Sequence, residues 1–213
     1  MANHCCGGAC PPTRPDASYR RVLWVALGVN AAMFLVEIGA GLAAGSVSLQ
    51  ADALDFMGDA ANYGISLAVL GLSLAARARA ALVKGASMGA FGLWVAGATL
   101  WNALHPAVPG AGVMGAVGTA ALLANIGTAA LLYAFRDGDA NRRSVWICSR
   151  NDAIGNLAVL FAASGVCATG TGWPDVAVAA IMATLALWGA AQVIGQARSE
   201  LRHDRAEPAA GRA

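Results

Sequence analysis

Carboxylate side chains lie at unusual positions in this sequence, inside long segments of apolar residues. The five acids concerned are Glu37, Asp52, Asp55, Asp59 and Asp152. An ionisable side chain in an apolar membrane segment is unfavourable, and it persists mainly where it faces a cavity, a partner or an ion. These residues are therefore the first candidates for chemistry.

The spacing of these polar residues places them on two helix faces. Residues three, four and seven apart share one face of a helix, so Asp52, Asp55 and Asp59 form one stripe, and a second consists of Cys148, Asp152 and Asn156. Two helices that each offer two ligands at i and i+4 can close a four-ligand cage of the tetrahedral kind that zinc prefers. Alternatively, the acids cap helix ends or pair with the two basic groups nearby, Arg150 and Lys84. We favour the cage because two basic groups cannot neutralise five embedded acids.

Long apolar segments must position these side chains. Of the 213 residues, 58% are hydrophobic and 12% are charged, whereas roughly 25% are charged in soluble domains. Six runs reach the length of about 20 residues that spans the hydrocarbon, at 22–44, 47–75, 80–104, 112–135, 144–168 and 173–194. We predict an all-α polytopic membrane protein with a six-transmembrane-helix bundle at 21–196. A disordered tail containing Cys and His at 1–20 and a short tail at 197–213 flank it.

The basic residues indicate an orientation. Apart from Arg150, every Lys and Arg lies before the first run, at the second or fourth connection, or after the sixth run; these are Arg14, Arg20, Arg21, Arg77, Arg79, Lys84, Arg136, Arg142, Arg143, Arg198, Arg202, Arg205 and Arg212. Because Lys and Arg are enriched in cytoplasmic loops, we expect both termini and the even-numbered connections in the cytoplasm. The net charge of +2 is small, and nucleic acid is not an expected partner.

Two stretches, GSVSLQADALDFMGDA and RRSVWICSRNDAIGN, resemble the metal-site helices of the cation diffusion facilitators, a family of zinc, cobalt and cadmium transporters. The resemblance covers roughly residues 20 to 200 and includes Glu37, Asn125 and the WPD turn at 173–175. It implies a metal site at Asp55, Asp59, Cys148 and Asp152. It also implies proton-coupled antiport, a homodimer in the lipid bilayer and cytoplasmic termini.

Three departures from the family pattern affect these expectations. Cys148 stands where the family commonly has His, and a thiolate shifts the expected preference toward zinc, cadmium or another thiophilic ion. Arg150 lies on another side of the helix and either lowers cation affinity or holds Cys148 as thiolate. The usual C-terminal cytoplasmic domain is missing, so dimerisation would rest on membrane helices, with small-residue faces at Gly41 and Gly45 or at Gly85 and Gly89.

A second group of potential ligands opens the chain. The start reads HCCGGAC, with His4, Cys5, Cys6 and Cys10. In a reducing cytoplasm, clustered thiols beside an imidazole bind metal more readily than they form disulfides, although the spacing matches no zinc-finger pattern. We expect either an accessory metal site there or a dispensable tail. Cys167 is interpreted as a small packing residue.

The leading interpretation is proton-coupled efflux of zinc, cadmium or cobalt across a bacterial-type inner membrane, with Glu37, Asp52, Asn156 and Arg150 as possible proton or supporting groups. The cation is then a transported substrate, and no cofactor is expected. The alternative is a non-transporting membrane metal receptor or accessory subunit. An enzyme is not expected, because no Ser-His-Asp or His-Glu-x-x-His arrangement appears and the three His, at 4, 105 and 203, lie away from the midplane of the helices.

Overall fold

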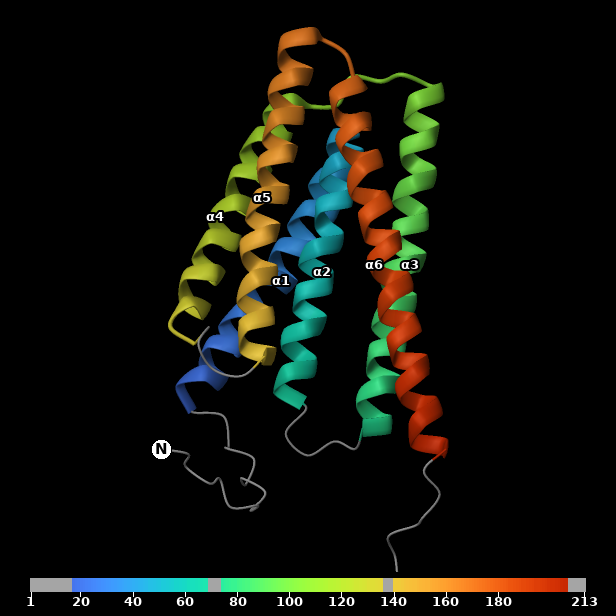
Figure 1. Ribbon diagram of the computed structural model, residues 1–213. Helices are drawn as coiled ribbons and strands as arrows, with labels where there is room; N and C mark the ends of the chain where they lie inside the picture. The colour runs from blue at the N-terminus through green and yellow to red at the C-terminus, as the bar shows by residue number, and fades with distance from the viewer. Residues whose placement is uncertain (1–16, 69–73, 136–139, 207–213) are drawn as a thin grey trace, which may run out of the picture.

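Six long helices make up the described part of the protein (Figure 1). The computed structural model describes residues 17–68, 74–135 and 140–206; the side chains of 74, 75, 77, 140–151 and 203–206 lie outside this description. The helices are α1 (Ala17–Ala44), α2 (Val47–Ala68), α3 (Leu74–Leu104), α4 (Ala111–Tyr133), α5 (Ala140–Thr169) and α6 (Trp173–Ala206). This confirms the predicted all-α bundle.

Five of the helices in the described part of the chain, all except α2, are long and apolar enough to cross a membrane. α2 differs because it carries three aspartates within 22 residues. It contacts α1, α3, α5 and α6 and stands in the middle of the bundle in Figure 1. More than half of its residues are buried. A polar helix is tolerated there because neighbouring helices, and not lipid, surround its acids.

The helices pack as two groups. α1, α2, α4 and α5 form one group, in which α1 contacts α2 and α4, and α5 contacts α2 and α4. The other group is the pair α3 and α6, which docks through α2 and α5. A methyl group on Gly85 of α3 would come within 2.8 Å of Ile194 Cγ1 of α6, so glycine is required for this close approach.

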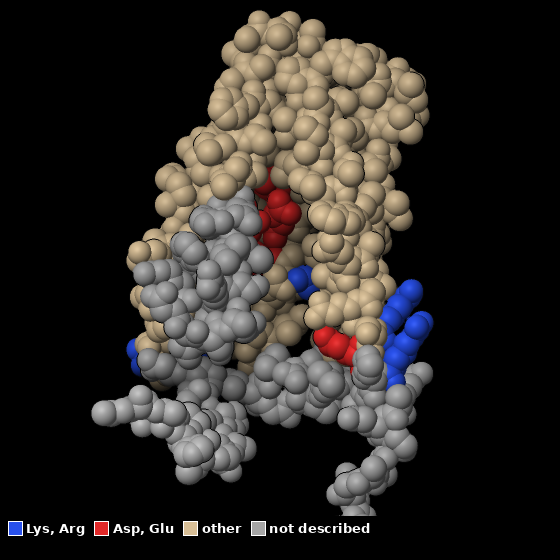
Figure 2. Space-filling model, in the orientation of Figure 1, with Lys and Arg blue, Asp and Glu red and all other residues tan. Residues whose placement is uncertain are grey.

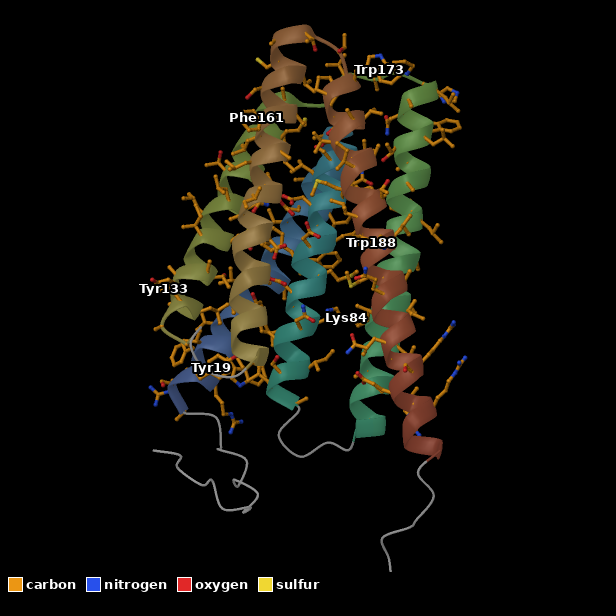
Figure 3. The ribbon with its side chains drawn as sticks, in the orientation of Figure 1. Tyr19, Lys84, Tyr133, Phe161, Trp173 and Trp188 are labelled. Carbon is orange, nitrogen blue, oxygen red and sulfur yellow. The ribbon has the colours of Figure 1, made fainter. Side chains whose placement is uncertain are left out.

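The outer surface of the bundle is apolar. Phe161, Trp173 and Trp188, labelled in Figure 3, are 76%, 57% and 65% exposed. Hydrocarbon, in place of water, is the environment that accommodates so many exposed large apolar side chains.

Two predictions about the helix ends are wrong. The run predicted at 47–75 is split, since α2 ends at Ala68 and α3 already begins at Leu74. Arg77, Arg79 and Lys84 therefore lie within α3 and not in the second connection. The physical reason is that Arg and Lys are good helix formers, so basic residues do not by themselves end a helix.

The predicted small-residue faces serve contacts within the chain. A methyl group on Gly41 would lie 3.0 Å from Gln50 Cγ, at the α1 and α2 contact, and Gly89 packs toward Ala190 of α6. With Gly85 also used against α6, these faces are not free for a second copy of the chain. Gly45 instead has φ +68°, the left-handed conformation that lets α1 turn into α2.

Candidate metal site

Two carboxylates of the candidate site come from the middle of α2. Asp59 is 5% exposed, and its Oδ2 accepts a hydrogen bond of 2.9 Å from the Tyr63 hydroxyl, one turn further along the helix. Asp55 lies one turn before Asp59 and is half-buried. The i and i+4 spacing therefore places both acids on one side of α2.

α5 supplies the third carboxylate. The Asp152 and Asp59 carboxyl groups lie within hydrogen-bonding reach of each other. One turn further on, a methyl group on Gly155 would lie 3.8 Å from Asp55 Oδ2, an ordinary contact distance, so α5 passes beside this acid. Asp55, Asp59 and Asp152, from two helices, thus lie near one another.

A cavity of about 520 Å³ adjoins these acids. Asp55 and Asp152 line it together with residues of α3, α5 and α6, among them Met88, Met182 and Leu185. Figure 2 shows acidic side chains inside a hollow midway along the molecule. The cavity lies at the contact between the four-helix group and the α3 and α6 pair, and it leads to the carboxylates from the side of that pair.

The fourth predicted ligand cannot be placed by its side chain. Cys148 lies in α5, one turn before Asp152, but its side chain and that of Arg150 are outside the described residues. Among the described side chains, no three His, Cys, Asp or Glu groups are arranged closely enough to hold a metal ion. Asp55, Asp59 and Asp152 therefore lie near one another but do not form a complete ligand group by themselves.

Asp52 and Asn156 share stripes with the ligands but face a different environment. Asn156 Nδ2 donates to Asp52 Oδ2 over 2.6 Å, and Asn125 Nδ2 of α4 donates to Asn156 Oδ1 over 2.8 Å. Glu37 of α1 is fully buried within hydrogen-bonding reach of Asp52. These four residues form a polar cluster, here called the Glu37 cluster, among α1, α2, α4 and α5.

Lys84 points from α3 toward α2 (Figure 3) and donates a hydrogen bond to Asn62 Oδ1. Both helices line a second cavity of about 410 Å³, with Met57, Lys84 and Met88 in its wall. Met88 belongs to the walls of both cavities. Lys84 is the only described Lys or Arg that lines either cavity, and this hydrogen bond joins it to a neutral amide.

One buried acid with a clear contact was missed by the reasoning from sequence. Asp175, in the first turn of α6, is 2% exposed and accepts hydrogen bonds from Ser46 Oγ, Val47 N and Ser48 N at 2.7, 2.8 and 3.1 Å. It caps the start of α2 from another helix. The available signals were the Trp-Pro-Asp start of one helix and the Gly-Ser-Val-Ser start of another, but only the fold brings them together.

The remaining sequence candidates lie elsewhere. His4, Cys5, Cys6 and Cys10 fall outside the described residues. Cys167, near the end of α5, is a free and exposed cysteine, so the interpretation of it as a packing residue is wrong.

Comparison with known protein families gives one result. A family model described as the cation efflux transmembrane domain matches residues 23–202, which cover α2 to α5 and most of α1 and α6. No curated protein matches the chain.

Proposed function

The chain belongs to the cation efflux family and is therefore a membrane transporter of metal cations; we propose that its substrate is zinc or a similarly thiophilic divalent ion, exported from the cytoplasm in exchange for protons. The observation that carries this proposal is the meeting of Asp55, Asp59 and Asp152 beside a cavity that two of them line. Three neighbouring carboxylates attract a cation, and with Cys148 they would supply four ligands, the number zinc prefers.

Ligand chemistry supports a thiophilic ion. Carboxylate oxygens alone suit magnesium or manganese, whereas a thiolate adds preference for zinc or cadmium. Cys148 precedes Asp152 by one helical turn, so in a continuous helix the two side chains share a face. A cobalt ion is accepted by the same ligand types, so the identity of the natural ion is left to measurement.

The charge balance at the site supports exchange against protons. Metal ligands must be deprotonated to bind, and a cation that arrives at clustered carboxyl groups therefore releases protons. When the ion leaves toward the outside, the same groups take up protons again. Bound cation and bound protons thereby compete for one set of oxygens, which is the requirement for antiport.

The packing of the two helix groups suggests how access alternates. The candidate site lies where α2 and α5 meet the α3 and α6 pair, and a tilt of this pair would change which end of the cavity is open. Rigid movement of one helix group against another around a fixed midplane site is a common transport mechanism. Met88, in the wall between the two cavities, would be displaced by such a tilt.

The orientation we propose has both termini in the cytoplasm of a bacterial-type cell. The start of α1 and the end of α6 lie at the same end of the bundle in Figure 1, together with the ends of α2 and α4. Basic side chains gather at this end in Figure 2. Enrichment of Lys and Arg on the cytoplasmic side supports this assignment.

Metal flux in proteoliposomes tests the proposal. The full chain should accumulate zinc in vesicles when a pH gradient is imposed, and Asp152→Asn and Asp59→Asn should each reduce the initial rate at least ten-fold. Glu200→Gln at the end of α6, where Glu200 accepts a hydrogen bond from Gln196, is the matched control and should transport normally. Zinc binding without flux by the unmodified protein would favour a non-transporting metal receptor or accessory subunit. Normal flux by Asp152→Asn would refute the site.

A further inference from the structure

The Glu37 cluster contains two carboxyl groups that are more deeply buried than any other acid pair in the described part of the chain. Glu37 is 0% exposed and Asp52 is 1% exposed. They come from α1 and α2 and lie within hydrogen-bonding reach of each other. Neither lines either of the two cavities described above. The pair is therefore separate from the wall of the metal cavity.

The unpartnered polar atoms of this cluster are all acceptors. Among the described side chains, Glu37 Oε1 and Oε2, Asp52 Oδ1 and Asn125 Oδ1 have no hydrogen-bond partner when the carboxyl groups are ionised. The amide donors point along a chain toward Asp52, from Asn125 to Asn156 and from Asn156 to Asp52 Oδ2. Two ionised carboxylates at hydrogen-bonding distance repel, and a buried charge without a partner is strongly unfavourable.

A single proton resolves both problems. If one carboxyl is protonated, its O–H donates to the other, the repulsion disappears and one negative charge is removed from the interior. Carboxyl pairs this close share one proton because both cannot remain ionised. A hard cation is a poorer occupant. Magnesium and calcium need several oxygens around them at roughly 2 to 2.6 Å, and two carboxyl groups in direct contact do not provide this arrangement.

No described basic group compensates the pair. The helices packed against α1 are α2 and α4. α2 contributes Asp52 and Asp55, which act electrostatically on Glu37, and α4 contributes the neutral Asn125. From α5, Asp52 faces the neutral Asn156 and the more distant Asp152. Among the described side chains, every charged group that acts on the pair is therefore acidic.

We propose that Glu37 and Asp52 form a proton-carrying pair, distinct from the metal ligands, that releases its proton when a cation binds at Asp55, Asp59 and Asp152. Asp55 lies one helical turn beyond Asp52 and interacts electrostatically with both members of the pair. A divalent ion at Asp55 brings positive charge next to the cluster and favours its ionised form. The carboxyl O–H bond breaks, the proton passes to solvent, and it is replaced from the outer solution after the ion leaves.

This inference rests on the proposed function and assigns one of the exchanged protons to a site outside the ligand set. The unmodified protein would therefore release more protons per bound zinc than its ligands alone account for. Glu37→Gln removes the proton but keeps a donor, since the amide N–H still reaches Asp52. Asp52→Asn removes the other half of the pair and serves if Glu37→Gln does not fold.

Calorimetric titration of zinc into the purified full chain in nanodiscs measures the proton count, when repeated in buffers of different ionisation enthalpy. Glu37→Gln should bind zinc within about three-fold of the unmodified affinity and release about one proton fewer per ion. Glu200→Gln should leave the count unchanged.

A count that is equal in Glu37→Gln, Asp52→Asn and the unmodified protein would overturn the inference while zinc binding stands. A count that depends on sodium, compared with choline, would also overturn it, in favour of a monovalent cation in the cluster. Absence of zinc binding by the unmodified protein would refute the proposed function itself.

Discussion

Asp175→Ala should destabilise the protein at the junction of α2 and α6, far from the candidate metal site. In the structure the Asp175 carboxylate accepts hydrogen bonds from two backbone N–H groups at the start of α2, Val47 N and Ser48 N, and from Ser46 Oγ. Val47 and Ser48 are both 0% exposed. Removal of the carboxylate therefore leaves two buried N–H groups of the first helical turn without an acceptor.

The magnitude follows from these two groups. A buried donor left unpaired costs about 1 to 3 kcal/mol, and replacement of an N-terminal capping side chain by Ala costs about 0.5 to 2 kcal/mol. Ser46 Oγ still accepts from Leu49 N, so part of the cap is retained. We expect a loss of about 2 to 4 kcal/mol in the free energy of unfolding for Asp175→Ala. Asp175→Asn keeps one acceptor oxygen and should lose about half as much.

Unfolding of the full chain by SDS in mixed micelles, followed by circular dichroism, measures this difference. Ser46→Ala is an intermediate control, because it removes the hydrogen bond to the carboxylate and the acceptor of Leu49 N but leaves both backbone contacts of Asp175 in place. The expected order of stability is unmodified protein, Ser46→Ala or Asp175→Asn, and then Asp175→Ala. If Asp175→Ala unfolds within about 0.5 kcal/mol of the unmodified protein, which is the usual range for an uninvolved surface position, the cap does not hold α2 and the reasoning fails.

Two further predictions concern α5 and α3. Cys148→Ser should weaken zinc and cadmium transport, whereas Cys148→His should keep zinc transport and lower the cadmium to zinc ratio, because imidazole is a harder ligand than thiolate. Initial transport rates for both ions check this, with Cys167→Ser on the exposed end of the same helix as the control. An unchanged ratio in Cys148→Ser would remove the thiol from the ligand set. Gly85→Val should destabilise the contact between α3 and α6 by about 1 to 3 kcal/mol, as overpacking typically does. Gly97→Ala, with nothing within 4 Å of the added methyl on the same helix, should leave the SDS midpoint unchanged or raised, and equal midpoints for the two variants would contradict the close packing.

The sequence by itself determined the helices and the register of the candidate ligands. Apolar runs of membrane-spanning length require helices, because backbone polar groups cannot remain unpaired in hydrocarbon. Spacing of four residues brings Asp55 and Asp59 to one face of a helix, and the structure has both residues within α2. Both conclusions depend only on distances along the chain, which a helix converts directly into positions around its axis.

Only the tertiary structure decided which neighbour each polar side chain meets. At about 100° per residue, Asp52 lies about 60° from Asp55 and about 20° from Asp59 around α2, so spacing alone could not separate it from the ligands. The fold does so by placing Glu37 of α1 and Asn156 of α5 beside it. The cap from Asp175 to α2 likewise joins residues 127 to 129 positions apart. Such contacts depend on how helices pack against one another, and local periodicity carries no information about that packing.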